Sequence, residues 1–551
     1  MGRRTASFWG MKGGRMKRMT APLLAVALLF GAALALSAGA GAEEPKPDFG
    51  MAGKRSATPD VAGYSKQHGP FSQFECFAVS GGANTKLDCD DPFPNNEPDI
   101  EVDPVAPNHM IGSSNDYGSC CDEIYTTFNN GATWANINVS RENPAVIGSD
   151  PVTVFDSKHG TAIHSSLNYN FSPGRGETCR GDVVVSVSTD GGIRWLRPVI
   201  VDTGIGCDTF NTQLFNDKEW IVTDNNPSSP FYGRSYLTWT KFVSASGEYL
   251  SSPIFESHSD DGGYTWSTPH AISGSNPALC TFQLAGAAGV CDENQFSVPT
   301  VGLDGTVYVA FQNEQNQALW ESGEQFDNQY LLVKSTDGGS HWSSPTFVVG
   351  LEDGSRDYPL NVDGRQTLTG YQVRVNSAGN IVASPRASEN GTLYLVFADN
   401  RNGTHDVASP VTNTDVFLMT STNGGSTWSG PTPVDGSATD QWFPWVDVNP
   451  ANGTAGILYN DRETADPSLY DAALTELPGG KTIVSTAPSH PTQSRFFQAE
   501  VAGCENCATF HGDYNNIDYG SNGKANMVWT DMRDPSDVPG LYSQFIYFAQ
   551  K

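Results

Sequence analysis

The sequence predicts an all-β fold, and three observations support this prediction. Helical periodicity is nearly absent along the 551 residues. Short runs of Val, Ile, Tyr, Phe and Trp are separated by Gly, Pro, Asn, Asp and Ser, which is typical of strands joined by tight turns. Two short phrases also recur along the chain at a roughly regular spacing, and such self-similarity predicts a repeat architecture.

The first phrase occurs five times and predicts a β-hairpin. It reads Ser/Thr-x-Asp/Asn-Gly/Asn-Gly-x-x-Trp. Asp-Gly and Asn-Gly supply the positive-φ residues of a tight turn, and the Asp or Asn side chain can cap backbone N–H groups of that turn. The Trp then returns to the sheet with a large ring to bury. The five copies span residues 127–134, 188–195, 259–266, 335–342 and 421–428.

The second phrase predicts a pair of adjacent strands. A polar or aromatic lead-in is followed by an apolar strand, a turn with Gly or Asn, and another strand. Seven copies of this phrase predict seven repeat units. The copies begin at Glu97, Asp150, Glu219, Val298, Ser384, Phe443 and His511.

The five hairpin phrases resemble the Asp-box, or bacterial neuraminidase repeat, of the sialidase-like β-propellers. The resemblance covers residues from about 95 to 548 and implies one large ring of four-stranded blades. The strand-pair count favours seven blades, and six, the number usual for true sialidases, is the alternative. In that family the Asp-box lies away from the ligand face, so its residues are expected to be structural.

The last repeat unit is one strand short of a complete blade. It ends at Leu541–Phe548. A propeller commonly closes by taking the missing strand from the opposite terminus, which removes a free sheet edge, and Phe74–Val79 is the candidate. We therefore assign residues 71–551 to one propeller, with an insertion near 351–380 and a degenerate sixth hairpin at Leu474–Gly480.

The first 70 residues have the composition of a targeting segment and a linker. Basic residues precede an apolar run at Ala21–Leu36, and small residues follow it. This order predicts a secretory signal peptide over residues 1–42, cleaved near Ala40 to Ala42, and a secreted, extracellular or periplasmic protein. The apolar run is short for a membrane span. Residues 43–70 are expected to be an extended linker.

The charge of the chain excludes several classes of partner. Six of the 32 Lys and Arg residues, and none of the 61 Asp and Glu residues, precede residue 43, so the mature chain has a formal charge of −35. Such a field repels nucleic acid and anionic lipid. An anionic substrate would need a local basic pocket.

The ten cysteines, an even number, predict disulfides in a secreted chain. The pairs that are close in sequence are Cys76 with Cys89, Cys179 with Cys207, and Cys280 with Cys291. The remaining four cysteines allow either further disulfides, which we favour, or a zinc site. They are Cys120, Cys121, Cys504 and Cys507.

The resemblance to sialidases implies a set of candidate site residues. In those enzymes an arginine triad grips the sugar carboxylate, a Tyr attacks the anomeric carbon, and an Asp is the general acid. Here Tyr514 is the candidate nucleophile, and Asp150 or Asp99 is the candidate acid. The candidates for the triad are Arg386, which we expect on an inner strand beside the channel, and Arg401, Arg462 and Arg533.

Two departures keep other interpretations open. The family's Arg-Ile-Pro phrase is missing, because the first inner strand reads Glu97-Pro-Asp-Ile100. The three Asp-Arg units at Asp399–Arg401, Asp461–Arg462 and Asp531–Arg533 could instead lock blades together by ion pairs. Aromatic residues near the inner strands, with Trp220 and Trp442 as candidate binding residues, either stack on sugar rings or plug the central channel.

The sequence therefore leaves two main hypotheses of function. The first is an exo-acting glycoside hydrolase of sialidase type that acts on glycan termini. The second is a non-catalytic propeller that binds glycans or proteins outside the cell. A lyase or hydrolase of neutral polysaccharides is a third hypothesis.

We expect a monomer with no organic cofactor. Dedicated metal-ligand spacing is absent, and the acidic runs Asp88–Asp91 and Asp99–Asp103 leave Ca²⁺ as an alternative.

Overall fold

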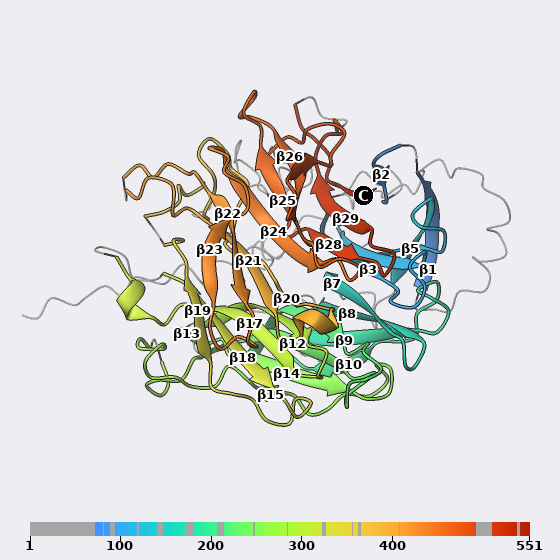
Figure 1. Ribbon diagram of the computed structural model, residues 1–551, viewed down its shortest axis with the longest axis horizontal. Coiled ribbons are helices and arrows are strands. Elements are labelled where there is room, and N and C mark those ends of the chain that lie inside the picture. Colours follow the sequence, from blue (N-terminus) through green and yellow to red (C-terminus); the bar gives the residue numbers. More distant parts are fainter. Residues whose placement is uncertain are drawn as a thin grey trace, which may run out of the picture.

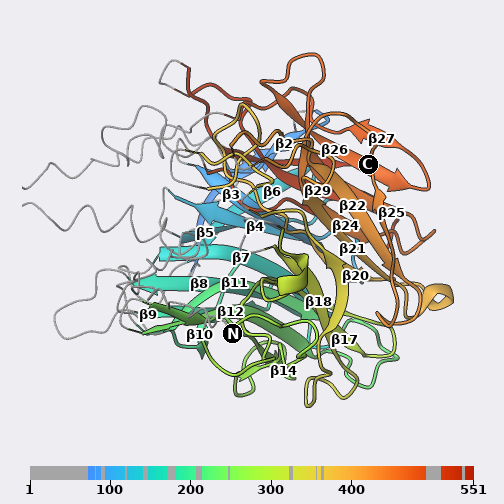
Figure 2. The same cartoon turned by 90° about the vertical axis from the view of Figure 1, so that its left-hand side faces the viewer.

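The structure, a computed structural model, is a seven-bladed β-propeller of antiparallel sheets, which confirms the predicted fold class and the favoured blade count. Its inner strands β3, β7, β24 and β28 lie toward the centre of the ring (Figure 1), and Figure 2 gives the view from the side. It describes residues 72–80, 82–88, 94–117, 121–139, 147–170, 180–205, 214–245, 248–283, 285–321, 327–354, 356–361, 365–406, 408–491, 510–536 and 540–551.

The blades follow one another along the chain, and each begins with its inner strand. The first blade contains β3 (Asn95–Val102), β4 (Met110–Asp116), β5 (Cys121–Thr127) and β6 (Thr133–Val139). The second contains β7 (Ile147–Asp156), β8 (Thr161–Asn170), β9 (Arg180–Ser188) and β10 (Val199–Asp202). The third contains β11 (Leu214–Thr223), β12 (Ser235–Ala245), β14 (Ile254–Ser259) and β15 (His270–Ala271), with β13 (Glu248–Ser251) beside β12.

The remaining blades repeat this order. The fourth contains β16 (Asn294–Val301), β17 (Val307–Asn313), β18 (Gln329–Ser335) and β19 (Thr346–Gly350). The fifth contains β20 (Ile381–Ala383), β21 (Leu393–Asp399), β22 (Asp415–Ser421) and β23 (Ser429–Pro433). The sixth contains β24 (Gln441–Val448), β25 (Ala455–Arg462), β26 (Tyr470–Leu477) and β27 (Lys481–Ile483). The seventh contains β28 (Asn516–Tyr519), β29 (Ala525–Asp531) and β30 (Phe545–Gln550). Regular helix in the described residues is limited to the 3₁₀ turns η3 (Gln317–Leu319) and η4 (Ala387–Glu389).

An N-terminal strand closes the ring, as predicted, but it is not the predicted segment. The short strand β2 (Thr85–Lys86) pairs with β30, and the Asp88 carboxylate accepts a hydrogen bond of 2.7 Å from Ile546 N. The assignment of Phe74–Val79 to this role is wrong: β1 (Ser72–Val79) pairs with β6 as a fifth strand of the first blade. Phe74 and Phe77 pack there against a buried apolar cluster, which favours the longer strand at that edge.

The five hairpin phrases form turns with one shared hydrogen-bond pattern. In the copy of blade 2, Ser188 Oγ accepts from Gly192 N at 2.9 Å and donates to the Asp190 carboxylate, which accepts from Arg194 N at 2.8 Å. Trp195 Nε1 donates to Gly192 O at 3.0 Å. The Ser/Thr and Asp/Asn bonds recur in the other four copies. The phrase therefore determines a local turn.

Each of four such turns is also tied to the preceding blade. The carbonyl of the first turn glycine accepts from Arg234 Nη1 at 2.6 Å in blade 4 and from Lys334 Nζ at 2.9 Å in blade 5. His109 Nε2 and Thr161 Oγ1 lie 3.0 and 3.1 Å from the equivalent carbonyls of blades 2 and 3. These contacts link the outer parts of adjacent blades.

Side chains of the inner strands link the blades near the axis. Asp447 accepts from Tyr519 N at 2.7 Å, and Asp518 accepts from Val102 N at 2.6 Å. Asn380 accepts from Val446 N at 2.8 Å in the same way. Because inner strands of different blades do not pair as sheets, these bonds satisfy backbone donors that pairing leaves free.

Residues 351–380 connect β19 to β20 and pack on top of blade 6. Their described part contains only isolated β-bridges. Tyr358, Leu368 and Tyr371 form a buried cluster with Trp442 and Phe443 of β24. This segment therefore covers the end of the ring at which the chain runs into the inner strands.

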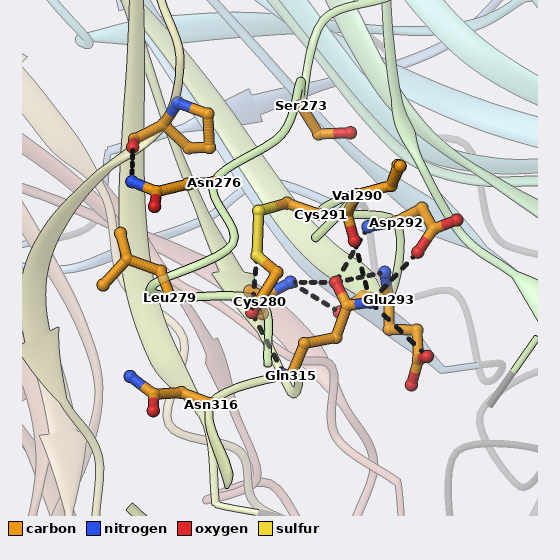
Figure 3. The surroundings of a disulfide bond; sticks show 12 residues. Ser273, Asn276, Leu279, Cys280, Val290, Cys291, Asp292, Glu293, Gln315 and Asn316 are labelled. Atoms are coloured by element: carbon orange, nitrogen blue, oxygen red, sulfur yellow. Dashed lines mark hydrogen bonds between the residues drawn. A yellow bond between two sulfur atoms is a disulfide. The ribbon is translucent and has the colours of Figure 1, made fainter. Parts of the chain in front are cut away.

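One predicted disulfide lies wholly within the described residues and is confirmed. Cys280 and Cys291 are bonded beneath a loop that Gln315 holds by accepting from Asp292 N at 2.8 Å and donating to Val290 O at 3.1 Å (Figure 3). Cys76 is also disulfide-bonded. The other predicted pairs and Cys504 and Cys507 involve positions outside the described residues, as do the signal peptide and linker. In the described part of the chain, no helix has the length and apolarity needed to cross a membrane.

Candidate functional site

Inner strands of five blades share one backbone irregularity. A non-glycine residue has a positive φ where the register with the second strand shifts. This left-handed conformation costs an L-residue roughly 1–2 kcal/mol, and such strain gathers at functional sites. The five residues are Glu97 (φ 57°), Asp150 (55°), Lys218 (51°), Phe296 (55°) and Phe443 (54°).

Five charged side chains gather near the ring axis, at the end where the inner strands begin, and we call them the axial cluster. Glu97, Asp150 and Lys218 come from the shifted positions of blades 1, 2 and 3. Asp513 precedes β28 of blade 7, and Arg374 comes from the 351–380 segment. All five residues are at most 9% exposed. Buried charges are costly unless they are paired, so this gathering is a strong candidate for a functional site.

Two carboxyl groups of the cluster form a hydrogen-bonded pair. Burial, together with the neighbouring Asp150 and Asp513 charges, holds the pKa of Glu97 well above its usual range. Burial also raises the pKa of Asp150, while hydrogen bonds from Ser149 and Glu97 and the charge of Lys218 oppose that rise. We therefore assign the proton of the pair to Glu97, which donates to ionised Asp150.

Asn115 fixes the geometry of this carboxyl pair. Its Nδ2 donates to Glu97 Oε2 at 2.6 Å, and its Oδ1 accepts from Asp150 N at 2.7 Å. Ser149 Oγ donates to Asp150 Oδ1 at 2.6 Å. One amide thus connects the shifted positions of two adjacent blades, which holds the two carboxyl groups in register.

Arg374 and Asp513 form a two-point ion pair beside Glu97. Arg374 Nε lies 3.0 Å from Asp513 Oδ1, and its Nη2 also contacts Asp513 Oδ2. The guanidinium carbon lies 4.1 Å from the Phe510 ring centroid. Gly512 has φ 89°, and a Cβ at this position would lie 2.9 Å from Glu97 N and Cγ. Only glycine allows this close approach between blades 7 and 1.

Lys218 is held by aromatic rings rather than by a direct ion pair. Its Nζ lies 4.0 Å from the Trp220 ring centroid and 3.9 Å from that of Tyr514. It has no hydrogen-bond partner among the described residues. Burial lowers the pKa of Lys218, and the nearby carboxylates Asp150, Glu97, Glu219 and Asp513 oppose that shift. The ring faces replace part of the lost hydration by cation–π attraction.

The structure brings three of the sequence-predicted site residues together. Asp150, Tyr514 and Trp220 meet around Lys218. Burial raises the pKa of Tyr514 well above its usual range, which opposes the phenolate that a nucleophilic role would require. Trp220 packs against Trp445 at 4.5 Å and against Tyr514 at 5.2 Å. These buried rings pack against one another near the axis. The geometry therefore favours aromatic residues that fill the central channel over aromatic residues that stack on sugar rings.

Two further candidates lie in structural positions. Asp99 accepts from Thr153 N and Oγ1 at 2.8 and 2.9 Å and from Asn516 Nδ2 at 2.8 Å, which ties three blades together, while burial raises its pKa to about 7. Trp442 is fully buried beneath the 351–380 segment, where its Nε1 lies 3.4 Å from His511 Nε2.

The four predicted triad arginines occupy four separate ion pairs. Arg401 and Arg533 bind Asp399 and Asp531 of their own blades through two atoms each. Arg462 Nη1 lies 3.0 Å from Asp440 Oδ2, also within its blade. These three ion pairs each join residues of the same blade. They therefore do not link neighbouring blades, as the alternative interpretation of the Asp-Arg units required.

Arg386 is not on an inner strand beside the axial cluster, and this placement is corrected. It precedes η4 in the turn after β20, where it bonds Glu389 at 2.5 Å and approaches Gly453 in the turn after β24. Both turns follow an inner strand, so they lie at the opposite end of the ring. The prediction failed because the inner strand of blade 5 is β20 (Ile381–Ala383), so the phrase that begins at Ser384 is the turn after this strand and not the strand itself.

Sequence reasoning missed four members of the axial cluster. Glu97 and Lys218 occupy the same position of the repeated strand phrase as Asp150, two residues before Asp99, Trp220 and Val152, and an alignment of the phrases could have revealed this. Asp513 follows a glycine in the seventh phrase. No sequence pattern pointed to Arg374, because it lies in the 351–380 segment, which has no counterpart in the other repeat units.

Three acids of the runs considered for Ca²⁺, namely Asp88, Asp99 and Asp103, have structural partners. Asp88 binds the backbone of β30, and Asp103 lies 3.0 Å from His109 Nδ1. Asp90 and Asp91 lie outside the described residues. A group that the sequence did not predict is Glu321, Glu352 and His405, whose ligand atoms lie within 4.8 Å of one another. It lies partly exposed on the rim, and His405 is already bonded to Asp357.

Comparison with known proteins gives structural matches only. No family model matches the chain, and no curated protein matches it. The chain is similar to a protein of unknown function from Dyadobacter fermentans, at 13% identity over 74% of this chain and 96% of that one, with a TM-score of 0.40.

Two solved glycoside hydrolases are similar to the same extent. The GH93 α-L-arabinofuranosidase of Fusarium graminearum, in complex with arabinobiose, matches at 12% identity over 72% of this chain and 99% of that one, with a TM-score of 0.44. NanB sialidase from Streptococcus pneumoniae matches at 10% identity over 80% and 83%, with a TM-score of 0.37. At these identities and TM-scores the likeness carries no argument about family or function, and the function is argued below from the residues of this chain.

Proposed function

We propose that this protein acts on glycans as an extracellular glycoside hydrolase whose proton donor is the Glu97–Asp150 pair. The observation that carries this proposal is the buried pair of Glu97 and Asp150, which Asn115 holds together and in which burial raises the pKa of both carboxyl groups, with Lys218 and Arg374 nearby. Glycosidic bonds require an acid that stays protonated near neutral pH, and perturbed carboxyl groups supply it. The disulfide between Cys280 and Cys291 supports a location outside the cell.

The chemistry follows from the protonation of the pair. Glu97 gives its proton to the leaving glycosidic oxygen as the bond to the anomeric carbon breaks. Water supplies the hydroxyl group that joins the anomeric carbon, and its second proton returns to the carboxyl pair. During the step Glu97 becomes a carboxylate, and the cations Lys218 and Arg374 offset the added negative charge.

The arginines favour an uncharged sugar over a sialic acid. A sialidase-type site needs guanidinium groups that converge on a substrate carboxylate. Arg401, Arg462 and Arg533 are each engaged with a carboxylate of their own blade, and Arg374 is engaged with Asp513. We therefore place the neutral-glycan hydrolase ahead of the exo-acting sialidase, which stays as the alternative substrate class.

The test is a hydrolysis panel with matched variants. The purified mature chain is offered neutral aryl glycosides, neutral polysaccharides and a sialoside, and product release is followed. We expect hydrolysis of a neutral substrate, and a loss of at least about 100-fold in kcat for Glu97→Gln and Asp150→Asn. Arg194→Ala, an exposed residue of a turn in blade 2, serves as the control and should be unaffected. Full activity of both carboxyl variants would reject this assignment.

The second candidate function is a non-catalytic glycan- or protein-binding propeller. It is favoured by the burial of the axial cluster, in which both cations already have carboxylates nearby. Isothermal titration with the same glycans distinguishes the two functions. Binding without product release, unchanged in Glu97→Gln, would support the binding propeller and contradict the hydrolase.

A further inference from the structure

Two glutamates and a histidine bring metal-ligating atoms together at the rim of blades 4 and 5, and we call them the rim cluster. They are Glu321, Glu352 and His405, and one ligand atom of each lies within 4.8 Å of the others. Glu321 follows η3 in the connection between β17 and β18, Glu352 follows β19, and His405 lies between β21 and β22. The packing of two adjacent blades therefore assembles this cluster from three separate segments.

The two carboxylates of the rim cluster gather without hydrogen-bond donors. The nearest cationic nitrogen to Glu321 is Arg356 Nε, at 3.8 Å from its Oε2, and His405 Nδ1 lies 3.9 Å from Glu352 Oε2. Both distances are longer than a hydrogen bond, and in the part of the chain that the structure describes neither carboxylate accepts one. Carboxylates that lie close together repel each other, so a cation between them would stabilise the arrangement.

A buried carboxylate orients the histidine of the rim cluster. Asp357 accepts a hydrogen bond from His405 Nδ1, and the side chain of Asp357 is only 2% exposed. Gly354 N donates to the other oxygen of Asp357 at 2.7 Å and fixes it in turn. A carboxylate bonded to one ring nitrogen sets the tautomer, so the other nitrogen keeps its lone pair for a metal.

The backbone that carries these ligands is held by bonds between blade 5 and the start of the 351–380 segment. Glu352 N donates to Asp399 Oδ2 at 2.9 Å, and Asn400 N donates to Glu352 O at 3.2 Å. These bonds join the chain after β19 to the end of β21, which leads on to His405. Ligands on fixed backbone positions lose less conformational entropy when they bind an ion.

The ligand atoms favour a divalent cation of the Zn²⁺ type over Ca²⁺. One imidazole nitrogen and two carboxylates are ligands that Zn²⁺ binds in four-coordinate sites with water in the open position, whereas Ca²⁺ takes oxygen ligands. Ligand atoms of a tetrahedral zinc ion lie about 3.3 Å from one another. The side chains of Glu321 and Glu352 are 41% and 42% exposed, so both have room to rotate and close the remaining distance.

We propose that the rim cluster binds one Zn²⁺-type cation, which links blade 4, blade 5 and the start of the 351–380 segment. Glu321, Glu352 and His405 are its ligands, and Asp357 is a positioning residue that orients the imidazole. The ion is structural, because it ties blade 5 to the segment that covers the end of the ring. The site does not depend on the proposed hydrolase function, since it is tested without any substrate.

Zinc has to displace a proton from this site. Partial burial lowers the pKa of His405, but the carboxylates of Asp357, Glu352 and Glu321 outweigh burial, so the net shift is upward. Without the ion, a protonated His405 balances part of the negative charge. Binding therefore releases a proton, and zinc affinity should fall as the pH is lowered.

The first experiment measures zinc binding to the full mature chain, prepared without a tag and freed of metal. Equilibrium dialysis with ZnCl₂ should give one zinc per chain. We expect His405→Gln and Glu352→Gln to weaken this binding by at least about 10-fold, and Asp357→Asn to weaken it by about 10- to 100-fold. His341→Gln is the matched control, because His341 also contacts a carboxylate, Asp337, but lies exposed in a turn, and it should leave zinc binding unchanged.

The second experiment identifies the ligands by cobalt substitution. Co²⁺ accepts the same kinds of ligand as Zn²⁺, so we expect visible absorption bands of a bound Co²⁺ ion that disappear in His405→Gln. The strong near-ultraviolet band of thiolate ligands should be absent, which distinguishes the rim cluster from a zinc site at the cysteines. ZnCl₂ at about 100 µM should also raise the melting temperature of the metal-free chain by about 2 °C or more, whereas CaCl₂ should not.

Three outcomes would overturn the proposal. The first is the absence of stoichiometric zinc binding, which would leave a protonated His405 as the partner of these acids. The second is zinc binding that is unchanged in His405→Gln and Glu352→Gln, and the third is stabilisation by CaCl₂ alone. If these two variants do not fold, Glu321→Gln replaces them, because this exposed side chain makes no hydrogen bond within the described residues, and unchanged zinc binding in this variant would equally contradict the site.

Discussion

The two sides of the ring use one backbone device for opposite purposes. In blades 1, 2 and 3 the left-handed position of the inner strand carries Glu97, Asp150 and Lys218, whereas in blades 4 and 6 it carries Phe296 and Phe443. The strain is the same on both sides, since all five φ angles lie between 51° and 57°. The backbone feature therefore belongs to the architecture, and the side chain decides whether it serves packing or chemistry.

The apolar side supports the charged side. Phe443 packs beneath the 351–380 segment with Tyr371 and Trp442, and this segment extends to Arg374, which binds Asp513 next to Glu97. The aromatic packing on β24 of blade 6 thus anchors the segment that places Arg374 beside the charged residues of blades 1 and 7. The predictions below test this division, from the largest expected effect to the smallest.

Removal of Arg374 should have the largest effect on stability. Arg374→Met leaves Asp513 buried without its partner, and breaking a buried ion pair typically costs about 3–5 kcal/mol. The melting temperature should fall strongly in thermal unfolding. The matched variant Arg386→Met breaks a partly exposed pair at the opposite end of the ring, which typically contributes about 0–1 kcal/mol. Equal losses of stability in both variants would show that the buried ion pair of Arg374 and Asp513 contributes no more than the partly exposed pair of Arg386.

Gly512→Ala should disturb the contact between blades 7 and 1. The added Cβ would lie 2.9 Å from backbone and side-chain atoms of Glu97, so we expect a loss of about 1–3 kcal/mol from overpacking in addition to the backbone strain. Gly540→Ala is the control, because its φ of 83° is similar but its Cβ meets nothing within 4 Å. Chemical denaturation compares the two. If the two variants lost the same free energy of unfolding, blade 7 would be able to move enough to accommodate the added methyl group.

Buried carboxyl groups near the axis should make the protein less stable as pH rises. Burial raises the pKa of Asp99 to about 7 and of Asp217 to about 8. The folded state then binds more protons than the unfolded chain above about pH 4. Their contribution to stability is complete below that pH and is lost progressively up to about pH 8, by roughly 1.4 kcal/mol per pH unit and group.

Melting temperatures between pH 5 and pH 8 test this dependence. Asp217→Asn should flatten the decline, whereas Phe296→Leu, on the apolar side, should leave its slope unchanged. Stability that rises with pH over this range would mean that these acids are ionised in the folded protein.

The smallest effect is expected at the outer rim of the ring. Arg234→Ala removes the bond to the turn carbonyl of Gly338 and the ion pair with Asp260, which we expect to cost about 1 kcal/mol. Activity should be retained, because the rim is remote from the axial cluster. The exposed Arg194→Ala should change neither melting temperature nor activity. A loss of activity in Arg234→Ala at full stability would place this rim in the functional site.

Local patterns in the sequence predicted local structure well. The five hairpin phrases form the predicted turns because Ser188, Asp190 and Gly192, and their equivalents, make these bonds within a few residues. The strand-pair phrase predicted seven blades for the same reason. The closing strand was assigned wrongly, because β1 and β2 lie close together in sequence and only their packing distinguishes their partners.

The site was predicted only in part. Asp150, Tyr514 and Trp220 were found because each lies on a repeated phrase, and the repeat fixes the end of the ring at which it lies. The arginines were assigned wrongly because each forms an ion pair within its own blade. Arg401 and Arg533 bind the aspartates with which they repeat, and Arg462 binds Asp440. Arg374 could not be predicted from a repeat to which it does not belong.

The sequence by itself determined the all-β class and the turns and favoured seven blades over six, since these depend on hydrogen bonds and alternation between residues that are near in the chain. Only the tertiary structure decided that Glu97, Asp150, Lys218, Arg374 and Asp513 meet, because they come from four blades and one insertion. Closing the ring brings these charges together, and their burial then decides which of them carry a proton.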